Sequence, residues 1–334
     1  MPLPLTDRFG RVHDYLRISV TDQCNLRCLY CMPEEGLEFM EKSRLLTADE
    51  MRSIVAAAAK LGIRKIRITG GEPLVRKDIV EIVEAVASAP GIEDVSLTTN
   101  GLLLASKAEA LKKAGLRRVN ISLDTLDPAK FVMIARRGDL AKVTEGIRAA
   151  AEAGFSPIKL NCVLLKGINE SEIADFLRMS HEKPLHVRFI EYMPIGHADE
   201  GWRSLYLPLT KVLEVAGGMP WAFERIPDVK GNGPSEDWRF EGAAGSFGLI
   251  HPISDRFCEN CNRLRLTADG YLKPCLYWVD ELYLKPYVGD EEALTDIFYK
   301  AMAIKPLNHE MASKLSGEVQ THVPTNRRMS QIGG

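Results

Sequence analysis

The sequence predicts an α/β fold: a partial (βα)6, TIM-like barrel followed by a C-terminal, partly β extension that closes the barrel mouth. Three observations in the 334-residue chain predict this class. Short β-rich runs alternate with amphipathic helical segments from residue 15 to about residue 195. Polar or glycine-rich runs follow the predicted strands, and the alternation fades beyond residue 200. Repeated βα units of this kind build a parallel sheet with helices outside.

Six strands are predicted in the first part of the chain, with amphipathic helices between them. In the helix expected over residues 47–62, Thr47 and Glu50 form a capping box and Gly62 is a suitable C-terminal cap. A second helix fits "KDIVEIVEAVASA", which is closed by "PG". The predicted strands span residues 15–20, 63–69, 95–99, 117–123, 158–165 and 186–192.

Runs of special residues follow five of the six strands. They are a cysteine-containing loop after the first strand, then "GGEP" (70–73), "TTNG" (98–101), "SLD" (122–124) and "EYMPIG" (191–196). In βα barrels the loops at the C-terminal ends of the strands converge, and active sites assemble there. The sequence therefore predicts one site at this end of the barrel.

The C-terminal part of the chain is expected to differ from the barrel. The segment 227–245 is rich in Gly and Pro and predicts irregular or hairpin structure, while Asp269-Gly270 between two short β-rich runs is a hairpin signal. We expect residues 1–210 to form the barrel and residues 211–334 to form a separate C-terminal region.

Composition excludes some function classes. A net charge of −2 and a pI near 6.4 argue against a general nucleic-acid or membrane-surface binder, which would carry a strong basic excess. The N-terminus lacks the apolar core of a signal peptide, and the apolar runs are too short to span a bilayer. We therefore expect a cytoplasmic protein. Its seven cysteines are then expected to be metal ligands rather than disulfides, except Cys162, which lies in an apolar run and is expected to be buried.

The first cysteine trio is Cys24, Cys28 and Cys31. Zinc usually takes a fourth ligand, yet no His occurs between His13 and His181. An iron–sulfur cluster held by three cysteines would keep one iron open to another ligand, and an open position is typical of reactive sites.

The second trio is Cys258, Cys261 and Cys275. Zinc with His251 as fourth ligand and an iron–sulfur cluster are both open readings from composition alone. If residues 261–267 are extended, Cys261, Arg263 and Arg265 share one face, with two arginines suited to bind a polyanion.

The chain resembles the radical S-adenosylmethionine (SAM) enzymes in two motifs. "CNLRCLYC" is similar to their cysteine signature, and "GGEP" to the motif that holds the methionine moiety of SAM. The resemblance implies that the open iron chelates SAM, and that an electron from the cluster yields methionine and a 5′-deoxyadenosyl radical.

A narrower resemblance extends over nearly the whole chain. "CENCNRLRLTADGYLKPC", "RFIEYMPIG" and the terminal "IGG" resemble the GTP 3′,8-cyclase family of molybdenum-cofactor biosynthesis. It implies a second [4Fe–4S] cluster whose open iron binds guanine, hydrogen abstraction from the ribose 3′ position, and attack of the sugar radical on C8. In that family the Gly-Gly end reaches into the active site.

The same resemblance implies roles for single residues, with Arg17, Arg263 and Arg265 the essential side chains. Met193 is open to a second reading as a packing residue, and Arg17, Arg67 and Lys159 need an anion only if they point inward. SAM is expected to contact Tyr30, Gly71, Ser122 and Met193. GTP is expected to contact Arg17, Arg67, Thr98, Lys159, Arg263 and Arg265.

The expected partners are GTP and an electron donor such as flavodoxin or ferredoxin, with no nucleic acid and no membrane, in a monomer or homodimer. Two alternatives remain at this point: a radical SAM enzyme that modifies peptides and carries an auxiliary cluster, and a non-catalytic zinc or electron-transfer protein.

Overall fold

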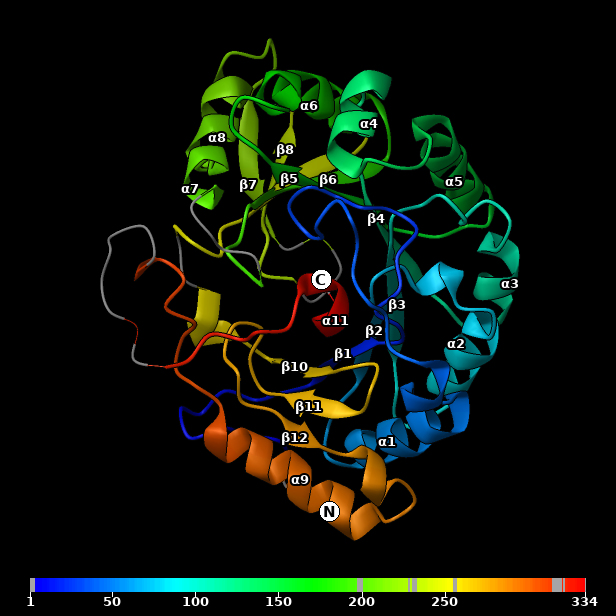
Figure 1. Ribbon diagram of the computed structural model, residues 1–334. Helices are drawn as coiled ribbons and strands as arrows, with labels where there is room; N and C mark the ends of the chain where they lie inside the picture. Colours follow the sequence, from blue (N-terminus) through cyan, green and yellow to red (C-terminus); the bar gives the residue numbers. More distant parts are fainter. Residues whose placement is uncertain are drawn as a thin grey trace.

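A computed structural model describes residues 4–196, 201–227, 229, 233–254, 257–313, 320 and 322–333. Its centre is a 12-stranded sheet that curves into an open barrel (Figure 1). The strand order is β12-β11-β10-β1-β2-β3-β4-β5-β6-β9-β8-β7. The expected partial barrel is confirmed, and the sheet does not close on itself.

The six predicted barrel strands are confirmed, each within a few residues of its expected bounds. They pair in parallel from β1 to β6, as βα units require. They are β1 Tyr15–Ser19, β2 Lys65–Thr69, β3 Asp94–Thr99, β4 Arg118–Ser122, β5 Ile158–Leu164 and β6 Leu185–Glu191.

Helices cover the outside of the sheet (Figure 1). The capping box between Thr47 and Glu50 starts α1, as the sequence predicts. The α-helices are α1 Ala48–Lys60, α2 Ile79–Ala87, α3 Ala108–Lys113, α4 Pro128–Ala135, α5 Leu140–Glu152, α6 Ile173–Glu182, α7 Trp202–Leu205, α8 Thr210–Gly217, α9 Glu291–Ile304 and α11 Met329–Ile332. The 3-10 helices are η1 Lys42–Arg44, η2 Pro73–Val75, η3 Glu170–Glu172, η4 Phe257–Asn260 and η5 Lys285–Tyr287.

The C-terminal strands extend both edges of the barrel sheet. On one side β10 pairs in parallel with β1, and on the other β9 pairs in parallel with β6. The hairpin predicted at Asp269-Gly270 joins β10 to β11. These strands are β7 Phe223–Ile226, β8 Glu236–Phe240, β9 Ser246–Ile250, β10 Arg263–Leu266, β11 Tyr271–Lys273 and β12 Leu282–Tyr283.

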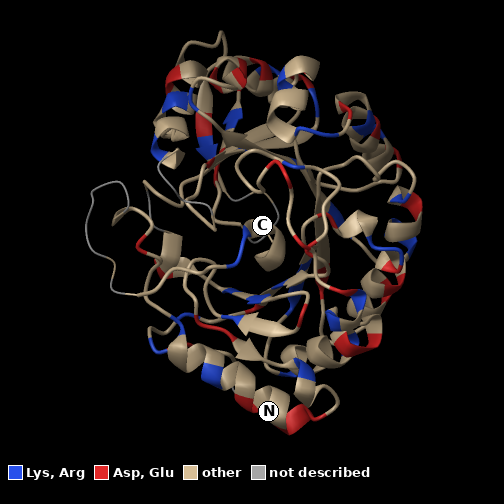
Figure 2. Cartoon of the chain, viewed as in Figure 1, with Lys and Arg blue, Asp and Glu red and all other residues tan. Residues whose placement is uncertain are grey.

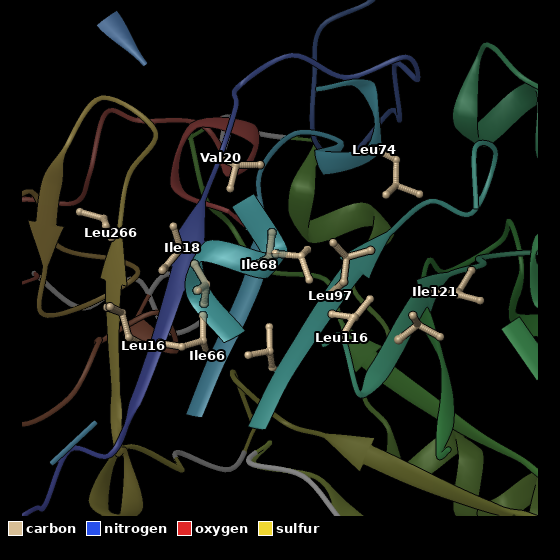
Figure 3. Packing of buried hydrophobic residues seen from close by; sticks show 14 of the residues in the cluster. Leu16, Ile18, Val20, Ile66, Ile68, Leu74, Leu97, Leu116, Ile121 and Leu266 are labelled. Atoms are coloured by element: carbon tan, nitrogen blue, oxygen red, sulfur yellow. The ribbon is translucent and has the colours of Figure 1, made fainter. Parts of the chain in front are cut away.

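Side chains alternate between the two faces of the barrel strands, because successive residues of a strand point in opposite directions. Leu16, Ile18, Ile66 and Ile68 are fully buried and pack toward the helices (Figure 3). The alternate positions therefore face the barrel interior. Cys162 is also fully buried in this core, as expected.

The C-terminal segment returns to the middle of the molecule, where α11 lies inside the curve of the sheet (Figure 1). Ile332 is fully buried there. Among the described residues, no helix is long and apolar enough to cross a membrane.

Candidate active site

The polar runs at the C-terminal ends of the strands meet at one cavity inside the barrel, here called the main cavity. Its wall includes residues from β1 through β6, from β10 and from α11. Nine of the ten residues predicted to contact SAM or GTP line it: Tyr30, Gly71, Ser122, Met193, Arg17, Arg67, Thr98, Arg263 and Arg265.

The first cysteine trio lies on this wall, in the loop that follows β1. The loop is fixed against the end of α4, because the backbone N–H groups of Arg27 and Leu29 donate to the carbonyls of Ala135 and Ile134. Burial raises the pKa of Cys24 to about 11 and, together with nearby Cys24, that of Cys31 to about 12. A bound metal would offset the cost of ionising these buried thiols, because cysteine binds a metal as the thiolate.

Gly70 and Gly71 let the chain that leaves the C-terminal end of β2 pass directly under the cysteine loop. A Cβ on Gly71 would lie 2.4 Å from the carbonyl oxygen of Gln23 and 2.6 Å from that of Asp22. The carboxylate of Glu72 then accepts hydrogen bonds from Thr99 Oγ1 and from the backbone N–H of Asn100. The "GGEP" run therefore sets the height of the cysteine loop above the sheet.

We expect Gly71→Ala to displace the cysteine loop, because the atoms its Cβ would meet belong to the backbone. Iron should fall from about eight toward about four per chain as the first cluster is lost. The matched control is Gly217→Ala, where a Cβ would meet nothing within 4 Å. Iron analysis of both variants is the measurement, and a full iron complement in Gly71→Ala would contradict this role.

Tyr30 and Asp124 are joined on the cavity wall. The Tyr30 hydroxyl donates to one carboxylate oxygen of Asp124 at 2.7 Å, and the Val163 N–H donates to the other at 2.9 Å. Burial raises the pKa of Asp124 to about 6. The bond fixes the aromatic ring beside Cys31, at the position predicted for SAM.

Three arginines form a row across neighbouring strands. Parallel pairing places Arg17 of β1 directly between Arg67 of β2 and Arg265 of β10. All three line the main cavity, so they point inward. Figure 2 shows Lys and Arg positions, in blue, on the strands next to the C-terminal segment.

The electrostatics of this row favour an anionic ligand. Burial, followed by the charge of Arg265, lowers the pKa of Arg17, and burial with neighbouring Arg263 lowers that of Arg265 to about 10. Like charges in a low-dielectric interior repel one another, and an anion between them removes that cost.

Lys159 is the one predicted contact residue that does not line the main cavity. It is buried, but its Nζ donates to the carbonyl of Val229 at 3.1 Å and it is absent from the wall of the main cavity.

Arg188 is a residue that the sequence reasoning missed. It lines the main cavity, and its guanidinium donates to the side-chain oxygens of Asn161 and Asn120. Burial and the charge of Arg67 lower its pKa to about 9. The available signal was an arginine inside the apolar run "HVRFIEY", the same pattern as Arg17 and Arg67.

The second cysteine trio lines a smaller cavity beside the main one. Arg263 donates to the sulfur of Cys261 and stacks over the ring of Phe257 at 4.7 Å. Residues common to the two walls are Met193, Phe257, Arg263, Arg265 and Leu276. The two cavities are therefore neighbours separated by the arginine-bearing strand.

The C-terminal segment enters the main cavity beside the first trio. The backbone N–H of Ser330 donates to the sulfur of Cys31, and the Gly333 carbonyl accepts from Arg265 Nη1 at 2.5 Å. Arg327 anchors the segment. Its guanidinium donates two hydrogen bonds of 2.8 Å to the carboxylate of Glu281 and forms an ion pair with Asp269. Gly334, the other half of the predicted Gly-Gly end, lies outside the described residues.

Both trios fit a three-thiolate iron–sulfur cluster. All six thiols are free, and each trio lines one cavity. In a [4Fe–4S] cluster each cysteine binds a different iron, so the thiols surround a cluster rather than one ion. The described part of the chain holds no group of three His, Cys, Asp or Glu around a single-ion position. His251 lies on neither cavity wall, against the zinc reading.

The barrel and the cysteine loop after its first strand define the radical SAM class. The family model of the radical SAM superfamily matches residues 18–180, and the model for Molybdenum Cofactor Synthesis C matches residues 185–311. The crystal structure of Streptococcus suis SuiB bound to S-adenosylmethionine is similar in fold, with a TM-score of 0.60 and 16% identity. The match covers 91% of this chain and 67% of that one.

Two relatives define the family more narrowly. The GTP 3′,8-cyclase of Listeria monocytogenes is 57% identical over 330 residues, and that of Limosilactobacillus fermentum is 51% identical over 330 residues. Each match covers 99% of both chains. The chain belongs to the GTP 3′,8-cyclase family.

Proposed function

We propose that this chain is a lyase that converts GTP to (8S)-3′,8-cyclo-7,8-dihydroguanosine 5′-triphosphate, the first step of molybdopterin biosynthesis. The observation that carries the proposal is the arrangement of the two cavities. A row of inward-pointing arginines lines the main cavity together with the first cysteine trio, and Arg265 at the end of that row also lines the cavity of the second trio. The whole-length similarity to cyclases supports the same substrate.

The first trio and the residues around it are proposed to bind a [4Fe–4S] cluster and SAM. Tyr30, held by Asp124, and Gly71, Ser122 and Met193 would orient SAM. When bound, the reduced cluster and SAM supply the 5′-deoxyadenosyl radical that removes the ribose 3′ hydrogen.

The arginines are proposed to bind the triphosphate. Arg17, Arg67 and Arg265 present a row of cations, and Arg188 and Arg263 add charge to the same cavity wall. Arginine binds phosphate oxygens in a two-pronged geometry that fixes orientation as well as distance. The Thr98 hydroxyl is buried and has no hydrogen-bond partner in the described part of the chain, so it is available to the ligand.

The second trio and the C-terminal segment are proposed to position the guanine and exclude water. Cys258, Cys261 and Cys275 would leave one iron of their cluster open to the base. Ile332 is fully buried, and the carbonyl of Gly333 accepts a hydrogen bond from Arg265. The segment would thereby complete the wall around the reacting sugar.

An electron donor of the flavodoxin or ferredoxin type is part of this proposal, since the first cluster must be reduced before it reacts. A cytoplasmic location is proposed with it, supported by the seven free cysteines.

Incubation of the reduced protein with SAM and GTP carrying deuterium at the ribose 3′ position tests the proposal. Deuterium should appear in 5′-deoxyadenosine, since the hydrogen is taken from that carbon. Unlabelled 5′-deoxyadenosine, or turnover with a peptide and none with GTP, would refute the cyclase assignment and favour the peptide-modifying alternative.

Binding of GTP should take up a proton at pH 8. Burial and the charge of Arg188 lower the pKa of Lys159 to about 6, so its amine is mostly neutral there. A triphosphate nearby favours the charged form and raises this pKa, so affinity should fall as pH rises above about 6. The terminal phosphate of GTP is fully ionised at pH 8 and adds no opposing release.

Calorimetry in buffers of different ionisation enthalpy measures this uptake directly. Lys159→Met should bind GTP without it. Equal uptake in the wild type and the variant would assign the proton to another group.

A further inference from the structure

A buried lysine, Lys305, lies among the segments that carry the second cysteine trio. It directly follows α9, is 2% exposed and lines the smaller cavity. Its Nζ donates to the carbonyl oxygens of Arg263 at 2.9 Å and of Pro274. The first of these is two residues beyond Cys261, and the second immediately precedes Cys275. One ammonium group therefore ties two ligand-bearing segments together.

The charge of Lys305 has no carboxylate to balance it. No ion pair links it to an acidic side chain in the part of the chain that the structure describes, and both of its hydrogen bonds go to neutral carbonyls. The buried carboxylate of Asp7 is already engaged by Arg11 at 2.6 Å and by His13 at 3.0 Å. A buried, unpaired cation costs several kcal/mol, so a structure that retains one needs an anion elsewhere.

The second cysteine trio is what this charge lies beside. Lys305 lines the same smaller cavity as Cys258, Cys261 and Cys275. The carbonyl groups that its ammonium binds belong to Arg263 and Pro274, on the two segments that carry Cys261 and Cys275. The structure therefore places a buried cation at the wall of the cavity that this trio lines.

We propose that Lys305 is the counter-charge of the second iron–sulfur cluster and makes that cluster easier to reduce. The inference rests on the proposed function, since it assumes that the second trio holds a [4Fe–4S] cluster. Three thiolates give the oxidised cluster one net negative charge, and uptake of one electron from the donor gives it a second. A fixed cation in a low-dielectric interior stabilises the more negative state.

The test compares Lys305→Met with the wild type by electron paramagnetic resonance during an anaerobic reductive titration of the full-length protein with both clusters. Addition of GTP identifies the signal of the second cluster, and addition of SAM identifies that of the first. The reduction potential of the second cluster should become more negative in Lys305→Met. The first cluster should keep its potential and serves as an internal reference.

Two further variants separate charge from packing. Lys305→Arg keeps the cation and should keep a potential close to that of the wild type. Lys285→Met is the matched control, because Lys285 Nζ also donates to backbone carbonyls, those of Ser43, Arg44 and Leu45, and Lys285 lines neither cavity. It should change neither potential.

Iron analysis keeps the result decisive. Loss of the second cluster in Lys305→Met but not in Lys305→Arg would support the same charge requirement. A full complement of iron with an unchanged potential in Lys305→Met would overturn the inference, as would loss of the cluster in both variants. A wild type with about four irons would instead refute the two-cluster proposal itself.

Discussion

Replacement of Arg265 by alanine is expected to lower kcat/KM for GTP by about 10²- to 10³-fold, the largest effect of any single arginine. Removing one partner of a buried charged contact costs about 3–5 kcal/mol. Arg265 lies beside Arg17 in register and also holds the carbonyl of Gly333, so its loss affects both the anion site and the C-terminal segment. Steady-state kinetics with GTP is the measurement.

The control for Arg265→Ala is Arg178→Ala, which removes an exposed arginine paired with Asp175 on α6. It should leave kcat/KM unchanged, because exposed pairs contribute little. Both variants should retain their iron. Unchanged GTP kinetics in Arg265→Ala with full iron would place this arginine outside the substrate site.

Replacement of Gly333 by alanine is expected to lower GTP turnover by about 10²-fold, as misplaced positioning groups commonly do. Gly333 has φ +82°, and a Cβ there would lie 2.4 Å from Cγ2 of Thr69. Backbone strain and a steric clash would therefore both push the C-terminal segment out of the main cavity. Turnover of GTP and limited proteolysis of the C-terminus measure the two consequences.

Two variants separate the clash from the strain. Gly242→Ala also places alanine at positive φ, +72°, but its Cβ would meet nothing within 4 Å, so turnover should be unchanged. Thr69→Ser removes the methyl group that alanine would meet, so it should restore part of the activity when combined with Gly333→Ala. If turnover is not restored in the double variant, the clash with Thr69 is not what displaces the C-terminal segment.

The barrel was predictable because its signals are local. Each barrel strand carries β-branched residues, and the capping box of Thr47 with Glu50 that starts α1 is visible in the sequence itself. The parallel pairing of β1 with β10 and of β6 with β9 was not predictable, since it joins segments that are distant in the chain. Pairing between remote strands depends on the whole fold and leaves no local pattern.

The same limit applies to the site. Strand alternation placed Arg263 and Arg265 on one face with Cys261, and the structure agrees in bringing both arginines to the cavity wall. The row that Arg265 forms with Arg17 could not be predicted, because it depends on pairing between strands that are distant in the chain. The bond from Lys159 to the carbonyl of Val229 was not predictable, because Val229 lies in a segment with no recognisable pattern.

The overall fold does not choose between substrates. SuiB shares the fold at 16% identity, which carries no argument about what this chain acts on. The choice rests on the row of inward arginines and on similarity to cyclases over 99% of the chain. A polyanionic substrate explains that row, whereas a peptide without phosphate does not.

The account depends most on two clusters, each held by three cysteines. Anaerobic iron and sulfide analysis of the purified protein, with each trio separately replaced by alanine, tests this directly. We expect about eight irons per chain in the wild type and about four in each variant. A protein that contains zinc and no iron, or about four irons that disappear with one trio alone, would contradict it.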